Sequence, residues 1–105
     1  MSTTRKSEAR VASSSDDDPV IKQYREKISD NDLKIIDAIN KRIKLVAQLK
    51  QYKEERHVEF FDPAREEWML TFVARANKGP LSSKGLQQVY RDVLAITKLE
   101  LDARK

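Results

Sequence analysis

The chain has 105 residues, which is room for one domain. Charged residues make up 36% of it, with 21 Lys and Arg against 17 Asp and Glu; this exceeds the roughly 25% of an average domain, so we expect a small core or a partner that completes it. There is no cysteine and one histidine, His57, which excludes disulfides, thiolate metal sites and a histidine cluster for zinc. No apolar run approaches the ~20 residues of a membrane span, and no signal-peptide core follows the N-terminus, so we expect a soluble cytoplasmic protein that does not bind membranes. Basic residues alternate with acidic ones along most of the chain, so we do not expect it to bind nucleic acid.

Residues 1–18, MSTTRKSEARVASSSDDD, are polar, rich in serine and offer almost nothing to bury. We therefore expect a disordered polar tail over residues 1–18 and one helical domain over residues 19–105. A first, very long helix is predicted from about Pro19 or Val20 to about Arg56. At about 1.5 Å per residue this helix is roughly 50 Å long or more.

A second helix is predicted from Asp62 and Pro63 to near Asn77. Aspartate is a preferred N-cap and proline fits the first helical position, so the start is well marked. Gly79, with Pro80 behind it, is a typical signal for the C-terminal end.

A third helix is predicted to begin around Ser82 or Ser83, whose hydroxyl serves as N-cap, and to continue toward the C-terminus. Strand-like alternation is absent, so the predicted fold is all-α with three helices per chain. Three helices of such unequal length do not form a compact monomeric bundle, because the long one overhangs its partners and exposes apolar surface. We therefore expect an obligate homodimer, an intertwined helical bundle in which the long helices pair with their counterparts.

Alternating steps of four and three residues trace a coiled-coil stripe along the first helix. Four of its ten positions are charged, and a buried charge costs several kcal/mol unless it is paired. One interpretation is that long side chains reach water or form a paired network that sets register. The other is a polar site inside the bundle. The stripe consists of Ile21, Arg25, Ile28, Asp32, Ile35, Ile39, Arg42, Val46, Leu49 and Lys53.

The spacing of the basic residues in this stripe favours a site. Arg42 and Lys53 are close to three full turns apart, so they share a face at a separation of about 16 Å and leave a gap suited to a small anion. Arg25 lies about 25 Å from Arg42 along the axis, too far to touch the same small ligand. In an antiparallel dimer Arg25 of the other chain reaches it, so each site would be shared between protomers.

The segment VEFFDPAREEW, residues 58–68, opens the second helix. Asp62 as N-cap and Glu66 in the first turn suit the positive end of the helix dipole. Arg65 does not, because its charge is unfavourable there. Helix capping alone therefore does not explain why these three residues occur together.

Several motifs together resemble the all-helical (AroQ-type) chorismate mutases over about residues 20–101. YREKISDND is similar to the start of their first helix and NKRIKLVAQLKQYK to its middle and end. FFDPAREEWML is similar to the segment that enters their second helix, and NKGPLS and YRDVL to the turn and third helix. The combination of two arginines, a lysine and then Asp-x-x-Arg-Glu is specific.

The resemblance implies a Claisen rearrangement of chorismate to prephenate, on the branch toward phenylalanine and tyrosine, with no cofactor, no metal and no covalent intermediate. It implies that Arg42 and the other chain's Arg25 bind the substrate carboxylates with their planar forks. Lys53 donates to the ether oxygen, which gains negative charge as its C–O bond breaks. Much of the remaining acceleration comes from holding the substrate in its compact reactive shape.

The same resemblance gives the 62–66 segment a function as one wall of the anion site. Glu66 accepts a hydrogen bond from the ring hydroxyl of the substrate. Asp62 presents its backbone at the mouth of the site, and Arg65 adds positive charge there.

The third helix departs from the family pattern. Thr97 stands where the family has Ser or Thr, but Leu101, one turn later, stands where it usually has Gln or Glu bonded to the ether oxygen. Either the helix is rotated so that Glu100 makes this contact, or the contact is missing. In the second case we expect weak activity that a partner raises.

Three alternatives stay open from the sequence. Isochorismate-pyruvate lyases resemble these mutases but generally lack the Asp-x-x-Arg-Glu segment, and an aminodeoxychorismate mutase is hard to separate by sequence. A non-catalytic or weakly active regulatory partner of the synthase that opens the shikimate pathway is the third, because related domains are fused to that enzyme or bound by it.

Overall fold

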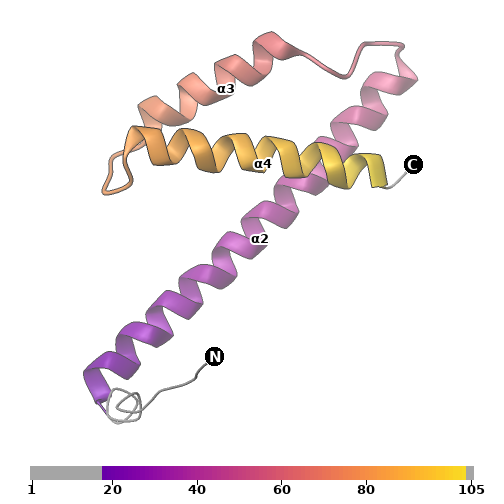
Figure 1. Cartoon of the computed structure of the whole chain (residues 1–105). Helices are drawn as coiled ribbons and strands as arrows, with labels where there is room; N and C mark the ends of the chain where they lie inside the picture. Colours follow the sequence, from indigo (N-terminus) through magenta and orange to yellow (C-terminus); the bar gives the residue numbers. More distant parts are fainter. Residues whose placement is uncertain (1–17, 104–105) are drawn as a thin grey trace, which may run out of the picture. The chain divides into compact units, whose positions relative to one another are not determined.

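The structure, a computed structural model, describes residues 18–103 (Figure 1). These residues form three α-helices and no strand: α2 (Pro19–Glu55), α3 (Pro63–Ala76) and α4 (Ser83–Ala103). The predicted all-α class with three helices, the first one very long, is confirmed. The tail predicted over residues 1–18 lies outside the described residues except for Asp18.

Helix α2 begins and ends through local hydrogen bonds. At its start, the carboxylate of Asp18 accepts from the backbone N–H of Val20 at 2.8 Å, which makes Asp18 the N-cap and Pro19 the first helical residue. At its end, the N–H of Val58 donates to the carbonyl of Lys53 at 2.8 Å, and His57 takes the left-handed conformation with φ 57°. This pattern is a Schellman motif, which turns the chain back sharply beside the last turn of the helix.

Helix α3 starts as predicted at Pro63, with Asp62 as N-cap: the Asp62 carboxylate accepts from the backbone N–H of Arg65 at 3.2 Å. It ends at Ala76 with Asn77 as C-cap. The Asn77 side chain also donates to the carbonyl of Leu81 at 2.8 Å. The amide of Asn77 therefore holds the turn that leads into α4.

Helix α4 begins where the sequence predicts. The hydroxyl of Ser82 accepts from the backbone N–H of Gly85 at 3.0 Å and caps the first turn. Gly79, in the turn before it, has φ 75°, a left-handed conformation that glycine adopts without steric cost.

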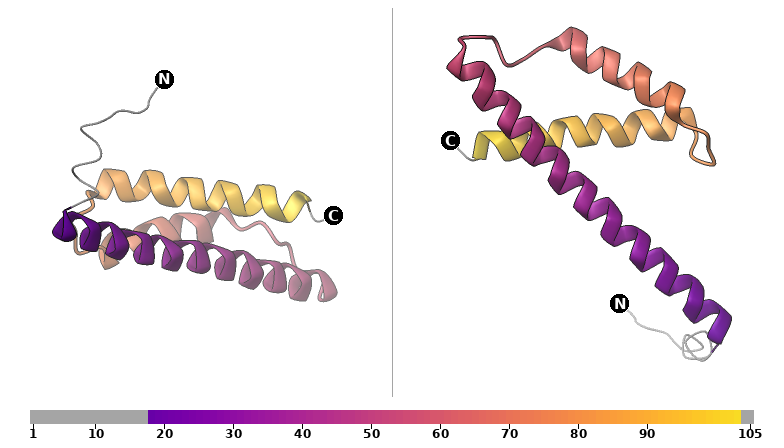
Figure 2. Two further views of the ribbon diagram at one scale, coloured as in Figure 1. Left: turned by 90° about the horizontal axis from the view of Figure 1, so that it is seen from below. Right: turned by 180° about the vertical axis from the view of Figure 1, so that it is seen from behind.

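The chain divides into two compact units, one up to Ala38 and one from Ile39 onward. The C-terminal unit contains the end of α2 together with α3 and α4, which run antiparallel and pack against each other (Figure 2). Its core is small, and the buried apolar residues are Ile43, Val73, Leu86 and Leu101.

In the N-terminal unit the described residues form the first part of α2, with most of its apolar side chains exposed. Ile28 is 60% exposed and Ile35 is 49% exposed. Within the part of the chain that the structure describes, none of the helices combines the length and apolar character needed to cross a bilayer. The homodimer concerns a second chain and stays a prediction.

Candidate active site

A cavity of about 200 Å³ opens in the C-terminal unit. Three helices and the segment that precedes α3 contribute its walls. Six of its lining residues are charged and seven are apolar; Thr97 is the remaining one. They are Arg42, Val46, Leu49 and Lys53 from α2, Phe60, Phe61 and Asp62 before α3, Arg65, Glu66 and Met69 from α3, and Leu94, Thr97, Lys98 and Leu101 from α4.

Arg42 is held toward the cavity by a side chain from α4. Its Nη1 donates to the hydroxyl of Thr97 at 2.8 Å, and this hydroxyl donates in turn to the carbonyl of Val93 at 2.8 Å. Thr97 is only 5% exposed, so its hydroxyl has no room to turn away. The threonine therefore orients the guanidinium without neutralising its charge.

Lys53 lies in the last turn of α2, where the Schellman motif returns the chain beside it. Its Nζ donates to the carbonyl of Phe60 at 3.4 Å, a long hydrogen bond, and lies 5.9 Å from the centre of the Phe60 ring. The ammonium has three protons, so this single weak contact leaves two of them for a ligand. Lys53 is thus a half-buried cation with donors to spare.

The two acidic residues that line the cavity, Asp62 and Glu66, have different interaction partners. Asp62 caps α3 with one carboxylate oxygen. Glu66 forms an ion pair with Lys98, at 2.9 Å between Oε2 and Nζ, and both side chains are partly exposed. The guanidinium of Arg65 lies over the ring of Trp68, at 4.0 Å to the centroid, so the aromatic ring supports this cation at the edge of the cavity.

Cations outnumber carboxylates around the cavity. Four basic side chains line it against two acidic ones. Within residues 18–103, neither Arg42 nor Lys53 forms an ion pair with a carboxylate. A partly buried site with uncompensated positive charge attracts an anion, and the apolar residues between the cations provide contact surface for its carbon skeleton.

The structure brings together seven of the eight residues that the sequence proposes for the site. Arg42, Lys53 and Thr97 line the cavity, as do Asp62, Arg65, Glu66 and Leu101. The eighth, Arg25, belongs to the N-terminal unit, and its part in the site stays a prediction.

The sequence leaves open whether Leu101 or Glu100 faces the site, and the structure places these two residues differently. Leu101 lines the cavity and is 4% exposed, whereas Glu100 is exposed and does not line it. The side of α4 that faces the cavity at this level is therefore apolar.

Sequence reasoning missed Lys98. This residue follows Thr97 directly and stands three positions before Leu101, a spacing that places residues on one helix face. The spacing along α4 therefore already indicates that Lys98 shares a helix face with Leu101. The ion pair to Glu66 was hidden because it joins residues 32 positions apart, and nothing in the sequence links them.

The lining residues suit electrostatic work rather than nucleophilic chemistry. They include no serine, cysteine or histidine, and the hydroxyl of Thr97 already donates to a backbone carbonyl. Within the described residues, no group of three His, Cys, Asp or Glu side chains is placed to hold a metal ion. The arrangement is able to bind a small anion with an apolar body and to stabilise negative charge that develops on it.

Comparison with known proteins identifies a family for most of the chain. The family described as chorismate mutase type II matches residues 24–100. This range contains Arg25 and every residue that lines the cavity except Leu101, which follows it directly.

Two curated relatives are bifunctional chorismate mutase/prephenate dehydratases. The one from Stutzerimonas stutzeri is 26% identical over 80 residues, which is 71% of this chain and 22% of the relative. The one from Pseudomonas aeruginosa is 26% identical over 84 residues, 75% of this chain and 23% of the relative. The chain therefore spans less than a quarter of the length of these relatives.

Proposed function

The chain belongs to the chorismate mutase type II family, and from this premise we propose that it converts chorismate to prephenate. The reaction is an isomerisation in which the enolpyruvyl ether C–O bond breaks while a C–C bond forms, so no atom enters or leaves. Chorismate carries two carboxylates, and its ether oxygen gains negative charge in the transition state. Such a reaction calls for cations in fixed positions rather than for a nucleophile or a cofactor.

The observation that carries the proposal is the pair of unneutralised cations in the cavity. Arg42 is oriented by a neutral hydroxyl, and Lys53 contacts a neutral carbonyl. Because neither charge is cancelled, both stay available to a dianionic substrate. In the proposed mechanism Arg42 binds a carboxylate and Lys53 donates to the ether oxygen, where its interaction is stronger in the transition state than in the ground state.

The other residues of the wall have supporting functions in this proposal. Glu66 accepts a hydrogen bond from the ring hydroxyl, and Arg65 and Asp62 form the mouth. Thr97 contributes by holding Arg42. The apolar walls and the cations together hold the flexible substrate in its compact reactive conformation.

We propose further that the second carboxylate is bound by Arg25 of a second copy of the chain. The exposure of Ile28 and Ile35 on the same part of α2 supports pairing with another apolar surface. The protein would then be a homodimer with two equivalent shared sites, formed by residues 19–105.

Leu101 favours a second candidate function. An apolar side chain at this place offers no hydrogen bond to the ether oxygen, whereas the family resemblance implies Gln or Glu there. The chain would then be a weakly active mutase whose rate rises when a partner, such as the first shikimate-pathway synthase, binds it. Its regulatory function would outweigh its intrinsic activity.

The test is a turnover assay of the purified chain with chorismate, with prephenate as the measured product. Lys53→Ala should lower kcat by about a hundred- to a thousandfold, because a donor to a developing oxyanion is lost. Lys53→Arg should not restore the native kcat, since a planar guanidinium group does not replace a compact ammonium group. Lys44→Ala, on an exposed face of the same helix, is the matched control and should keep the native rate.

Each alternative has its own outcome in this assay. Release of pyruvate from isochorismate would identify a lyase. Turnover of aminodeoxychorismate in preference to chorismate would identify the amino-specific mutase. If the isolated chain does not turn over chorismate but does so when the first shikimate-pathway synthase is added, the chain is the regulated partner of that synthase.

A further inference from the structure

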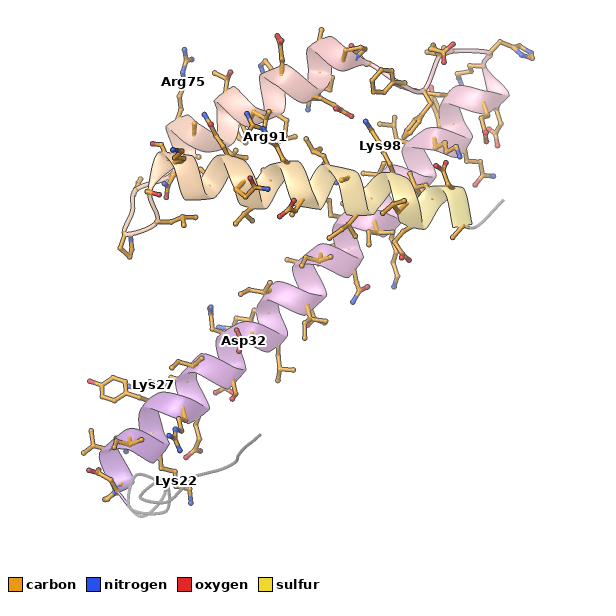
Figure 3. The ribbon with its side chains drawn as sticks, in the orientation of Figure 1. Lys22, Lys27, Asp32, Arg75, Arg91 and Lys98 are labelled. Carbon is orange, nitrogen blue, oxygen red and sulfur yellow. The ribbon has the colours of Figure 1, made fainter. Side chains whose placement is uncertain are left out.

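Lys98 is a cavity residue that the proposed mechanism does not use. It lies on α4 directly after Thr97, and Figure 3 shows it extending from α4 on the side where α3 lies. Its Nζ is 2.9 Å from Oε2 of Glu66 and 4.6 Å from the centre of the Phe61 ring. Two contacts of different kinds thus hold the ammonium at one place on the cavity wall.

The contact changes what Glu66 offers to a ligand. A carboxylate that stands alone in a cavity attracts any cation. One oxygen of the Glu66 carboxylate contacts Lys98, and the ion pair as a whole has no net charge. The other oxygen of Glu66 can still accept a hydrogen bond. The ion pair therefore offers a ligand a hydrogen-bond acceptor without a net negative charge.

This distinction matters for the group at the ring position that Glu66 is proposed to contact. A ring hydroxyl is a neutral donor and needs only an acceptor. A ring amine is protonated at neutral pH and brings a positive charge, which would lie close to the ammonium of Lys98. The surplus of cations around the cavity adds to this repulsion.

We propose that Lys98 is a specificity-determining residue, which makes this site select a ring hydroxyl over a ring ammonium group. The inference rests on the function proposed above, because it takes Glu66 as the acceptor for that ring position. It assigns the discrimination to repulsion against the wrong substrate rather than to a better contact with the right one.

A purely structural reason for the ion pair is weaker. Both side chains are partly exposed, and an exposed ion pair contributes little to the stability of a fold. Helices α3 and α4 also pack against each other, and each of them buries apolar residues, among them Val73 on α3 and Leu86 on α4. The charge of Lys98 is thus better placed to act on a ligand than to hold the helices together.

The experiment compares chorismate with 4-amino-4-deoxychorismate, for both kcat/KM and the dissociation constant, on the full chain. In Lys98→Met, which keeps the length of the side chain and a good helix propensity, the preference for the hydroxyl substrate should fall about tenfold, an effect limited by solvent screening. Lys98→Arg should keep the preference because it keeps the charge. Lys84→Met, an exposed position on the same helix, is the matched control and should leave both substrates unchanged.

A preference that stays the same in Lys98→Met, with both substrates weakened equally, would overturn the inference and leave the mutase function intact. If the native chain binds both compounds but turns over neither, the proposed function fails, and the ratio of dissociation constants still decides the role of Lys98. Binding of neither compound would overturn both proposals. Circular dichroism of each variant shows whether the helices are kept.

Discussion

The two parts of α2 carry one repeating stripe of residues but differ in what covers it. From Arg42 to Lys53, the stripe lines a cavity whose other walls come from α3, α4 and the segment between α2 and α3. From Ile21 to Ile35, the same pattern continues, and Ile28 is 60% exposed and Ile35 49% exposed within the described residues. A heptad pattern thus specifies a face that is to be covered, but not which chain covers it.

The basic residues of the stripe also lie in different surroundings. Arg42 and Lys53 have defined neutral partners in their own chain. Arg25 lies on the part of the stripe where the neighbouring apolar residues are exposed. The proposed second copy would cover that surface and bring Arg25 to a site in the same step.

The first prediction tests whether a second copy covers the exposed stripe. Ile28→Asp should weaken dimerisation by about a thousandfold, because two buried isoleucines are lost per dimer at roughly 2 kcal/mol each. Sedimentation equilibrium of the native and variant chains measures this. Lys27→Asp, one position away and off the stripe, should leave the dimer in place; equal weakening in both variants would contradict the proposed interface.

The second prediction tests the shared site. Arg25→Ala and Lys53→Ala should each be nearly inactive, since each removes a cation from every site. After subunit exchange of an equal mixture, half of the dimers are mixed, and each of these has one intact site, so about a quarter of the native rate should return. A mixture that stays inactive after exchange, shown by mass spectrometry to be complete, would rule out a contribution of Arg25 from the other chain.

The sequence predicts the helices well because local chemistry sets their ends. Pro19, Pro63 and the serine cap before α4 all begin helices where expected, and each depends on residues within one turn. The predicted end of α2, Arg56, is one residue beyond the observed end at Glu55, but the sequence does not predict the left-handed conformation of His57. Histidine adopts this conformation less readily than glycine, so the sequence carries little sign of it.

The site was predictable in its list of residues rather than in its contacts. Family motifs and helical spacing name seven residues that line the cavity. The hydrogen bond from Arg42 to Thr97 and the ion pair between Glu66 and Lys98 join residues far apart in sequence. Such contacts depend on how α4 packs beside the other helices, which no local pattern determines.

The third prediction concerns the apolar wall at Leu101. Leu101→Gln should raise kcat/KM by at least about tenfold, because a missing hydrogen bond to developing charge typically costs a hundred- to a thousandfold and a new one is imperfectly placed. Glu100→Ala should change little, since Glu100 is exposed and does not line the cavity. Loss of activity in Glu100→Ala would show that the acid, and not position 101, serves the ether oxygen.

The fourth prediction separates the two parts of the Thr97 side chain. Thr97→Val keeps the volume but removes the hydroxyl, so Arg42 loses its orienting acceptor and kcat/KM should fall about fivefold, in line with one lost hydrogen bond. Thr97→Ser keeps the hydroxyl and should stay active, while the missing buried methyl lowers the free energy of unfolding by about 1 kcal/mol. Steady-state kinetics and urea unfolding of both variants distinguish these effects. Equal activity of the two would mean that the hydroxyl does not position Arg42.

The smallest expected effect lies where α2 ends, in the Schellman motif beside Lys53. His57 holds a left-handed φ of 57°, and a residue with a Cβ pays roughly 1 kcal/mol for this conformation. His57→Gly removes that strain but adds freedom to the unfolded chain, so the free energy of unfolding should rise by about 0.5 kcal/mol. Glu59→Gly, two residues later and without a positive φ, gains nothing from glycine and should unfold more easily. Because the motif is local, His57→Gly should leave both kcat and the dimer unchanged. A fall in kcat instead would mean that the imidazole, and not only the backbone turn, helps to place Lys53.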